Sequence, residues 1–356
     1  MSHTSATPQI SVIIPAYNCD RYIGQAVESI LNQTYPADEI IIIDDGSQDN
    51  TRQVLQPYAD SIRYVYQENQ GVSVARNHGL NLARGEFIVF LDADDTFLPD
   101  KLAAQLAVFQ AQPHLGLVQS GWRRVTHTAE TLMDATPWDY VPELNLENWL
   151  RWKPLGTMGT LMFRREWLLK IEGFEPGLAH AEDVDLILRM ALLGCESAWL
   201  RQSTVCYRQH DRNTMRDGIS QAKSINYVLD KFFNLPNIPL EIRLIENWVR
   251  YSTLVWSSWY LYYTGFPVEM AEYLQKSWQY TPFLAVETLT NWTESFVHYS
   301  DSLGQSLNVN LLCNLPAWQS LTLWVLQQTI EKHSQPLEPE IVALRARERG
   351  TGNREQ

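Results

Sequence analysis

The chain has 356 residues and a formal net charge of −13, and it is long enough for one large domain or two smaller ones. The acidic balance argues against a general nucleic-acid-binding protein, because affinity for a phosphate backbone depends on Lys and Arg. It does not argue against binding a nucleotide diphosphate through a metal ion. The four cysteines are scattered and lack the CxxC spacing of a zinc site, which suits a reducing compartment.

The ends of the chain and its uncharged stretches bear on where the protein works. Residues 1–9 are polar and contain no apolar core, so we expect no signal peptide. Residues 251–268 and 302–330 lack charge, but Ser, Tyr, Asn, Gly and Pro interrupt them, which disfavours a membrane span. We therefore expect a cytoplasmic protein, with peripheral contact at the inner membrane face as the minor alternative. The sequence does not indicate an oligomeric state.

The first two thirds of the chain alternate between short apolar runs and amphipathic segments. The apolar runs predict strands at residues 10–14, 39–43, 62–66, 87–91, 160–163 and 198–207. Helical spacing of apolar residues predicts helices near residues 23–31, 49–59, 74–83, 102–109 and 184–192, with the second disturbed at Pro57. This order predicts an α/β fold with a mostly parallel, Rossmann-like sheet sandwiched between helices.

The remaining segments are less regular. Residues 126–154 predict a long loop or short helices near the sheet edge, and loops of that length are often functional. After about residue 215 strand patterns stop and apolar residues recur at helical spacing. We therefore expect a sheet-containing domain over residues 1–215, an α-helical domain or extension over residues 216–345, and a disordered tail over residues 346–356.

Three aspartates, Asp92, Asp94 and Asp95, directly follow the apolar run at residues 87–91. A strand that ends in carboxylates places them at the carboxyl edge of the sheet, where ligands of open α/β sheets bind. Carboxylates this close repel one another unless a cation or hydrogen-bond donors compensate, and Mg²⁺ prefers such oxygen ligands together with substrate phosphates. The alternative is an acidic turn that caps the next helix.

A second acid pair, Asp44 and Asp45, ends the strand predicted at residues 39–43. Because parallel strands end at one edge, all five aspartates should face one crevice. A carboxylate there can accept a hydrogen bond from the imide of uracil or from a ribose hydroxyl, a role that suits Asp45. Another can ligate a divalent metal that bridges a diphosphate, a role that suits Asp92 and Asp94.

Five blocks of sequence resemble family 2 glycosyltransferases. They are residues 11–18 (SVIIPAYN), 43–47 (IDDGS), 71–77 (GVSVARN), 91–95 (LDADD) and 181–186 (AEDVDL) with Arg189. The resemblance covers roughly residues 9–215, and it is specific because five blocks occur in the right order and spacing. It implies a GT-A fold, a nucleotide-diphospho-sugar donor and inversion at the anomeric carbon.

The resemblance also implies roles for individual residues. By position, the donor nucleotide would be bound by Pro15, Ala16, Tyr17, Asp44, Asp45, Arg76, Asp92 and Ala93. Asp45, with Asp44, would contact the base, Arg76 would lie near the base and phosphates, and Asp92 would hold the ribose. Asp94 would hold Mn²⁺ or Mg²⁺, and Asp183 would be the catalytic base that takes the proton of the acceptor hydroxyl. The alternative for Asp183 is a helix N-cap.

Weaker patterns concern His210 and the tryptophans. An imidazole suits a metal or diphosphate site, so His210 is a candidate second metal ligand, with a solvent-exposed loop histidine as the alternative. Glu182 is expected on the acceptor side. Trp138 and Trp152, with Trp149, form a candidate stacking platform for an acceptor sugar, and the alternative is packing in the core.

The sequence therefore predicts an inverting, metal-dependent glycosyltransferase that moves a sugar from a nucleotide-diphospho-sugar, with UDP as the expected carrier, to a hydroxyl of a glycan or lipid-linked acceptor, as in cell-surface polysaccharide synthesis. A nonenzymatic sugar-nucleotide sensor or scaffold on the same fold is the alternative. A nucleotidyltransferase is disfavoured, because residues 10–18 form no Gly-rich basic loop. The sequence does not name the donor sugar or the acceptor.

Overall fold

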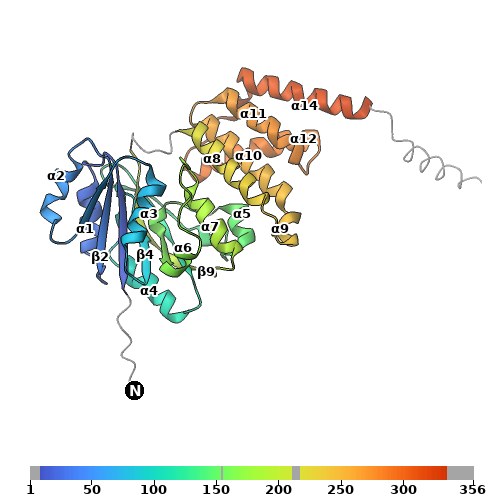
Figure 1. Cartoon of the computed structure of the whole chain (residues 1–356). Coiled ribbons are helices and arrows are strands. Elements are labelled where there is room, and N and C mark those ends of the chain that lie inside the picture. The colour runs from blue at the N-terminus through green and yellow to red at the C-terminus, as the bar shows by residue number, and fades with distance from the viewer. Residues whose placement is uncertain (1–8, 154, 211–216, 335–356) are drawn as a thin grey trace, which may run out of the picture. The chain divides into compact units, whose positions relative to one another are not determined.

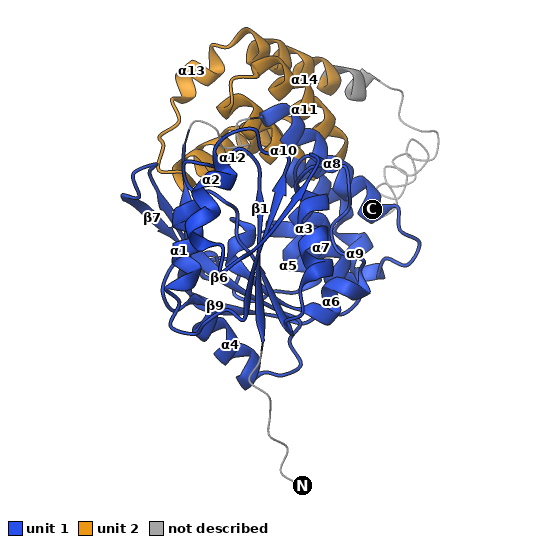
Figure 2. Ribbon diagram, turned by 60° about the vertical axis from the view of Figure 1, so that its left-hand side comes forward, with its two compact units in different colours: residues 1–253 blue, residues 254–356 orange. Residues whose placement is uncertain are grey.

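The structure is a computed structural model that describes residues 9–153, 155–210 and 217–334, with side chains as far as residue 329. The chain divides into two compact units, residues 1–253 and 254–356 (Figure 2). The boundary expected at residue 215 falls within residues 211–216, which lie outside the described ranges, as does the tail expected at residues 346–356. Helices that follow residue 216 are thus shared between the unit that contains the sheet and the second unit.

The first unit is built on one mixed sheet, which includes the labelled strands β2, β4 and β9 (Figure 1). The sheet has nine strands in the order β3-β2-β1-β4-β8-β6-β9-β5, and β7 pairs with β6. The strands are β1 (Ile10–Ala16), β2 (Glu39–Asp45), β3 (Arg63–Gln67), β4 (Phe87–Phe90), β5 (Thr96–Phe97), β6 (Leu117–Val125), β7 (Thr131–Ala135), β8 (Leu161–Arg164) and β9 (Ser197–Arg208). The half from β3 to β4 is parallel, β6 and β9 are also parallel, and β8 joins the two halves with antiparallel pairing.

Helices cover the sheet and form the rest of the chain. In the first unit they are α1 (Ile23–Leu31), α2 (Thr51–Leu55), α3 (Val72–Leu82), α4 (Lys101–Ala111), α5 (Leu146–Trp152), α6 (Arg165–Lys170), α7 (Glu182–Leu192), α8 (Gly218–Phe233) and α9 (Leu240–Leu244). Helix α10 (Glu246–Tyr263) spans the division between the units. The second unit then has α11 (Pro267–Ser277), α12 (Ala285–Ser302), α13 (Val309–Cys313) and α14 (Pro316–Ser334).

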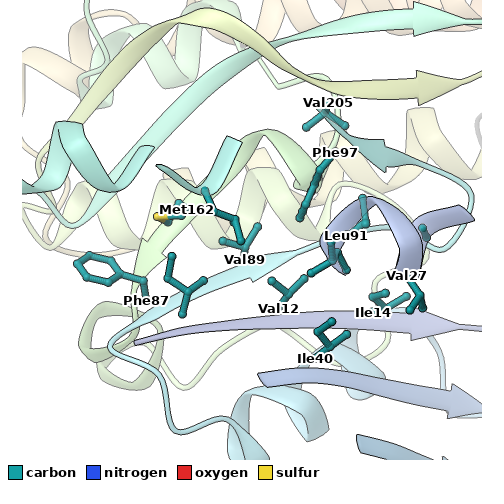
Figure 3. Close-up of a cluster of buried hydrophobic side chains, with 14 of the residues drawn as sticks. Val12, Ile14, Val27, Ile40, Phe87, Val89, Leu91, Phe97, Met162 and Val205 are labelled. Carbon is teal, nitrogen blue, oxygen red and sulfur yellow. The ribbon is translucent and has the colours of Figure 1, made fainter. Parts of the chain in front are cut away.

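The central strands are buried on both faces, as their continuous apolar runs predict. In β1, Val12 and Ile14 point to one face and Ile13 to the other, and all three are completely buried. The first face packs against α1, α2 and α4, where Val27, Leu55 and Leu102 join the same core as Val89. Figure 3 shows part of this core, with Val12, Ile14 and Val27 labelled. This packing fixes the register of β1 between β2 and β4, because a slip by one residue would exchange the two faces.

Helix α3 lies against the other face of β1 and β2 with little space between them. Gly79 allows this approach, because a Cβ at this position would lie 2.4 Å from Cγ2 of Ile13 and 3.4 Å from Cγ1 of Ile43. The preceding turn begins at Gly71, where φ is +90°, a conformation that glycine adopts without strain. The close contact of α3 with the sheet positions Arg76 and Asn77, which follow in this helix.

The structure confirms the predicted α/β fold and most of the predicted elements in the described residues. Three strands, β5, β6 and β7, were missed. The long strand β6 contains Gln119, Ser120 and Gly121, so it lacks an apolar run, although Ser120 is completely buried and its hydroxyl is 2.6 Å from that of Thr204. Strand β5 has only two residues, too few for a periodic pattern.

The prediction of a long loop or short helices at residues 126–154 is confirmed for the short helices, but it missed a strand. This stretch contains strand β7, a 3-10 helix (Pro137–Asp139) and α5. The disturbance predicted at Pro57 is confirmed, because α2 stops at Leu55 and a 3-10 helix (Gln56–Tyr58) follows. In the portion of the chain that the structure describes, no helix combines the length and apolarity needed to cross a bilayer.

Replacing Gly79 tests the close packing of α3. Gly79→Ala should lower the free energy of unfolding by about 1–3 kcal/mol, because the new methyl group overlaps Ile13 unless the backbone moves. Gly24→Ala in α1 is the matched control: its Cβ would lie 3.4 Å from Cγ1 of Val54, an ordinary contact, and stability should stay the same or rise slightly. Urea unfolding midpoints measure both variants, and equal values would contradict the packing.

Candidate active site

The acids that end β2 and β4 lie at one edge of the sheet, because both strands run parallel to β1 and flank it. The chain that leaves β1 joins this edge to the end of β2: the Asn18 N–H donates to Ser47 Oγ at 2.9 Å, and Asn18 Oδ1 accepts from the Gln48 N–H at 2.8 Å. Burial raises the pKa of the Cys19 thiol to about 12, and the charges of Asp49, Asp44 and Asp94 add to this rise.

Asp45 and Asp44 are both buried and already accept several hydrogen bonds. Asp45 accepts from Gln67 Nε2 and from the backbone N–H groups of Gln70 and Gly71, at 2.7 to 2.9 Å. Asp44 accepts from the Ser47 N–H at 2.8 Å and from the Tyr64 hydroxyl at 2.5 Å. Since a carboxylate offers about four acceptor positions, each retains capacity for a ligand. Asp44 also holds the turn after β2, and Asp45 holds the turn between β3 and α3.

The remaining residues predicted for the nucleotide lie at the ends of β1 and β4. Pro15 and Ala16 are the last residues of β1, paired in register with Ile43 and Asp44, and Ala16 is 1 % exposed. Tyr17, directly after the strand, is 52 % exposed and offers its ring to solvent. Ala93 is 8 % exposed and lies between the acids that follow β4. The structure thus brings these four residues to the same sheet edge.

Arg76 connects the end of β4 to the beginning of α7. Arg76 is 3 % exposed. Its guanidinium donates from Nη2 to Asp92 Oδ1 at 2.7 Å and from Nη1 to Glu182 Oε1 at 2.6 Å. It also lies over the ring of Phe174, 5.3 Å from the centroid. Its Nε atom is buried and makes no hydrogen bond to any described residue. The side chain expected near the donor nucleotide therefore also contacts the helix that begins with Glu182 and Asp183.

Asp95 is a structural partner of β9. It is 1 % exposed, and its carboxylate accepts the Arg208 N–H at 2.9 Å and the Thr157 hydroxyl at 3.0 Å. The same hydroxyl lies 3.2 Å from Asp92 Oδ2. Burial, with the charges of Asp94 and Asp92, raises the pKa of Asp95 well above its usual range. Helix α4 begins after Asp100 without a side-chain cap, so the alternative of a capping turn for these acids was wrong.

Asp94 and His210 come together although 116 residues separate them. His210 Nε2 is 2.9 Å from Asp94 Oδ2, and the His210 side chain is 9 % exposed. The imidazole is stacked on Tyr22, with ring centroids 5.0 Å apart, and the Arg208 guanidinium lies over Tyr22, 4.7 Å from its centroid. The alternative of a solvent-exposed loop histidine was therefore wrong.

The pair of Asp94 and His210 fits one edge of a divalent-metal site. It supplies one carboxylate oxygen and one imidazole nitrogen, a donor set that Mn²⁺ accepts. Within residues 9–153, 155–210 and 217–334, no group of three or more His, Cys, Asp or Glu side chains is arranged to hold a metal ion. A cation on this pair would need further ligands, and the phosphates of a substrate are the usual source.

Asp183 lies in the first turn of α7. The N-cap is Ala181, with φ of +60° and no capping side chain, so the alternative of an N-cap role for Asp183 was wrong. Its carboxylate accepts the Val184 N–H at 2.7 Å. Burial and then the charge of Glu182 raise the pKa of Asp183 to about 7, against the opposing effects of that N–H and of Arg76. An acid with this pKa exchanges protons near neutral pH.

The tryptophans have different environments. Trp149 is 2 % exposed and belongs to the core. Trp138 packs edge-on against Trp199, with ring centroids 5.9 Å apart. Trp152 is 55 % exposed and lies beside Tyr140, which is 56 % exposed, with ring centroids 6.4 Å apart. Of the three, only Trp152 keeps most of its ring available to a ligand.

The sequence analysis missed several residues that support the site through direct contacts but lie elsewhere in the sequence. Thr157 and Arg208 bond to the acids and Tyr22 stacks on His210, but none of the three lies in a recognisable motif. Asn77 and Arg189 belong to the blocks that resemble the family, yet their partners could not be predicted: Asn77 bonds to both backbone groups of Phe174, and Arg189 bonds to Asp185 and to two carbonyl groups.

Two kinds of sequence comparison identify relatives. Residues 11–171 match the sequence model of the family described as Glycosyl transferase family 2, a segment that ends before α7. The chain is 34 % identical over 213 residues to a Bacillus subtilis (strain 168) protein, TuaG, named for teichuronic acid biosynthesis, with 58 % of this chain and 81 % of TuaG covered. It is 33 % identical over 216 residues to chondroitin synthase of Escherichia coli, with 58 % of this chain but only 30 % of that longer enzyme covered.

Solved structures share the fold at low sequence identity. A Staphylococcus aureus TarS fragment, residues 1–349, in complex with UDP-GlcNAc superposes with a TM-score of 0.60 at 19 % identity, covering 83 % of this chain and 92 % of the fragment. The mannosyltransferase PcManGT of Pyrobaculum calidifontis, in complex with GDP-Man and Mn²⁺, gives 0.56 at 20 % identity, covering 92 % and 88 %. The fold is thus the predicted GT-A fold, and the chain belongs to the family 2 glycosyltransferases.

Proposed function

We propose that this glycosyltransferase inverts the anomeric carbon as it moves a sugar from a nucleotide-diphospho-sugar to a hydroxyl of a glycan or lipid-linked acceptor in polysaccharide synthesis. One observation carries the proposal: the buried acid Asp183 follows Glu182, which shares Arg76 with Asp92 at the end of β4. A candidate proton acceptor is thereby joined to a candidate donor site. The relatives named for chondroitin and teichuronic acid support a polysaccharide product.

The donor nucleotide would bind at the edge formed by the ends of β1, β2 and β4. Tyr17 is exposed there for contact with the base, and Asp44 and Asp45 retain acceptor capacity for the base imide. Asp92 keeps 30 % of its side chain accessible for a ribose hydroxyl. The TarS complex with UDP-GlcNAc supports UDP as the carrier, and the PcManGT complex with GDP-Man makes GDP the second choice.

Asp94 and His210 would hold a divalent cation that neutralises the charge of the departing nucleoside diphosphate. The two side chains are within 2.9 Å of each other, and the stack of His210 on Tyr22 fixes the orientation of the imidazole. The Mn²⁺ in the PcManGT complex supports this choice of metal.

Asp183 would take the proton of the acceptor hydroxyl. In a single-displacement transfer the hydroxyl attacks the face of the sugar opposite the leaving group, and one carboxylate placed there suffices. A pKa raised to about 7 makes Asp183 a stronger base than an ordinary aspartate while it still ionises near neutral pH. Trp152, with Tyr140 beside it, would offer an exposed aromatic face to the apolar side of an acceptor sugar.

Family membership favours an enzyme over a nonenzymatic sugar-nucleotide sensor, because the relatives include named synthases. The two functions differ in one measurable respect. A sensor binds the donor and never consumes it, even with a broad panel of acceptors, whereas a transferase releases the nucleoside diphosphate when a suitable acceptor is present.

A thermal-shift screen of nucleotide sugars with and without Mn²⁺ tests donor and metal together. A ligand that binds only the folded state at a hundred times its Kd stabilises by about 2.7 kcal/mol. UDP-GlcNAc, GDP-Man and further nucleotide sugars are the probes, and at least one should raise the midpoint more with Mn²⁺ than without it. Asp94→Ala should weaken this metal-dependent binding by at least about tenfold, equal to about 1.4 kcal/mol.

The control for this screen is Asp60→Ala, a change at an exposed position, which should behave as the wild type. The absence of a shift with every nucleotide sugar would contradict the donor site. A shift in Asp94→Ala that depends on Mn²⁺ as strongly as in the wild type would contradict the metal role.

Asp183→Asn should keep donor binding and lose about 10²–10⁴ of the transfer rate, because the amide cannot accept a proton. Transfer is measured by release of the nucleoside diphosphate in the presence of the acceptor, and binding by the thermal shift with the same donor. Loss of donor binding equal to the loss of transfer would argue against a base, and unchanged transfer would exclude it. Asp60→Asn is the matched control.

A further inference from the structure

Arg76 is the point at which two distant parts of the first unit meet. Asp92 lies 16 residues from it in sequence and Glu182 lies 106 residues away, yet both carboxylates bond to its guanidinium at 2.7 and 2.6 Å. The Arg76 side chain is 4 % exposed. The planar fork of a guanidinium presents separate N–H groups to the two carboxylates in a fixed geometry, whereas a lysine ammonium is a point charge on a flexible stem.

Neighbouring contacts make the approach to α7 rigid. Asn77, next to Arg76 in α3, bonds to the N–H and the carbonyl of Phe174 at 2.8 and 2.7 Å. Gly173 must be glycine there, because its φ is +71° and a Cβ would lie 2.3 Å from Asn77 Oδ1. From the other side, Arg189 of α7 donates to the carbonyls of Ile171 and Gly173 at 2.7 Å. Two consecutive residues of α3 thus fasten the segment that leads to Asp183.

The charges around Asp183 come from several elements. Its pKa is raised to about 7 by burial first and by Glu182 second, is lowered by the Val184 N–H and then by Arg76, and is raised by Asp92. The helices packed on α7 are α5 and α8. Of their charged groups, Arg151 on α5 pairs with Glu147, and Lys231 on α8 pairs with Asp185 and Glu175. Glu182 is therefore the negative group, and Arg76 the positive group, that most affects the pKa of Asp183.

We propose that Arg76 and Glu182 are positioning residues of the base: Arg76, bonded at once to Asp92 and Glu182, holds the first turn of α7 against the end of β4 and balances the negative charge around Asp183. The inference rests on the proposed role of Asp183 as the base. It gives Glu182 a function other than acceptor contact, because its carboxylate is bound by Arg76 and its side chain is only 13 % exposed.

The proposal predicts that two substitutions shift the protonation midpoint of Asp183 in opposite directions. Glu182→Gln removes a negative charge next to Asp183, so the protonation midpoint of Asp183 should fall, by roughly one pH unit. The glutamine oxygen still accepts from Arg76, which preserves the contact. Arg76→Met removes the compensating positive charge and leaves three carboxylates together, so the midpoint should rise by a similar amount. A role limited to packing would lower stability in both variants without moving the midpoint in opposite directions.

The midpoint can be measured without any substrate. The full chain is labelled with aspartate carrying ¹³C at its side-chain carboxyl, and the Asp183 signal is identified by its absence in Asp183→Asn. A pH titration by NMR then gives the midpoint in the wild type, Glu182→Gln and Arg76→Met. The matched controls are Glu68→Gln and Arg201→Met, which change the same residue types at exposed positions and should leave the Asp183 midpoint unchanged.

The outcomes separate this inference from the proposed function. A fall in Glu182→Gln with a rise in Arg76→Met supports it, and an unmoved midpoint, or movement of both in one direction, overturns it. If Arg76→Met does not fold, Glu182→Gln decides alone: only a fall supports the inference. With the donor found in the screen, the acidic limb of the pH profile of kcat/KM should move with the midpoint. If Asp183→Asn retains transfer, the base role fails, whatever the titration shows.

Discussion

The dominant physical constraint on this molecule is the concentration of carboxylates at one edge of a sheet. Two aspartates end β2, three follow β4, and α7 adds Glu182 and Asp183 close by. Buried carboxylates are costly unless donors or cations compensate them. The fold supplies Arg76 from α3, Arg208 from β9 and backbone N–H groups from the turns that follow β2 and β3. These partners come from segments far apart in sequence, so compensation of this charge requires that the first unit be folded.

The same contacts relate chemistry to architecture. Helix α3 packs against β1 and β2 with only the width of a glycine between them, and its Arg76 and Asn77 then reach across to the segment before α7. Strand β9 ends at Arg208, whose N–H, guanidinium and stack on Tyr22 fix Asp95, Asp94 and His210 in turn. Two arginines thus hold the candidate donor site, the metal pair and the base. This explains how these side chains keep defined positions although they follow strand ends and turns.

Much of this could be predicted from the sequence, and the exceptions have physical reasons. Strands β1, β2 and β4 are apolar throughout because both of their faces are buried, so their positions and the acids that end them were readable. The position of strand β6 could not be predicted, because it buries two polar residues, Gln119 and Ser120. The Ser120 hydroxyl finds a partner in the hydroxyl of Thr204. The proximity of His210 to Asp94, and of Arg76 to Glu182, depends on pairings across more than a hundred residues. No local pattern specifies such pairings, although the types of these residues marked them as candidates.

The hydroxyl of Thr157 joins two acids that the fold uses differently. It has one hydrogen to donate, yet it lies within hydrogen-bond distance of both Asp92 and Asp95. Asp92 is bound by Arg76, whereas Asp95 is buried and bound by the Arg208 N–H of β9. One hydroxyl outside every block that resembles the family thus connects the acid expected to hold ribose to the acid that anchors β9, so its loss would remove a partner from both carboxylates at once.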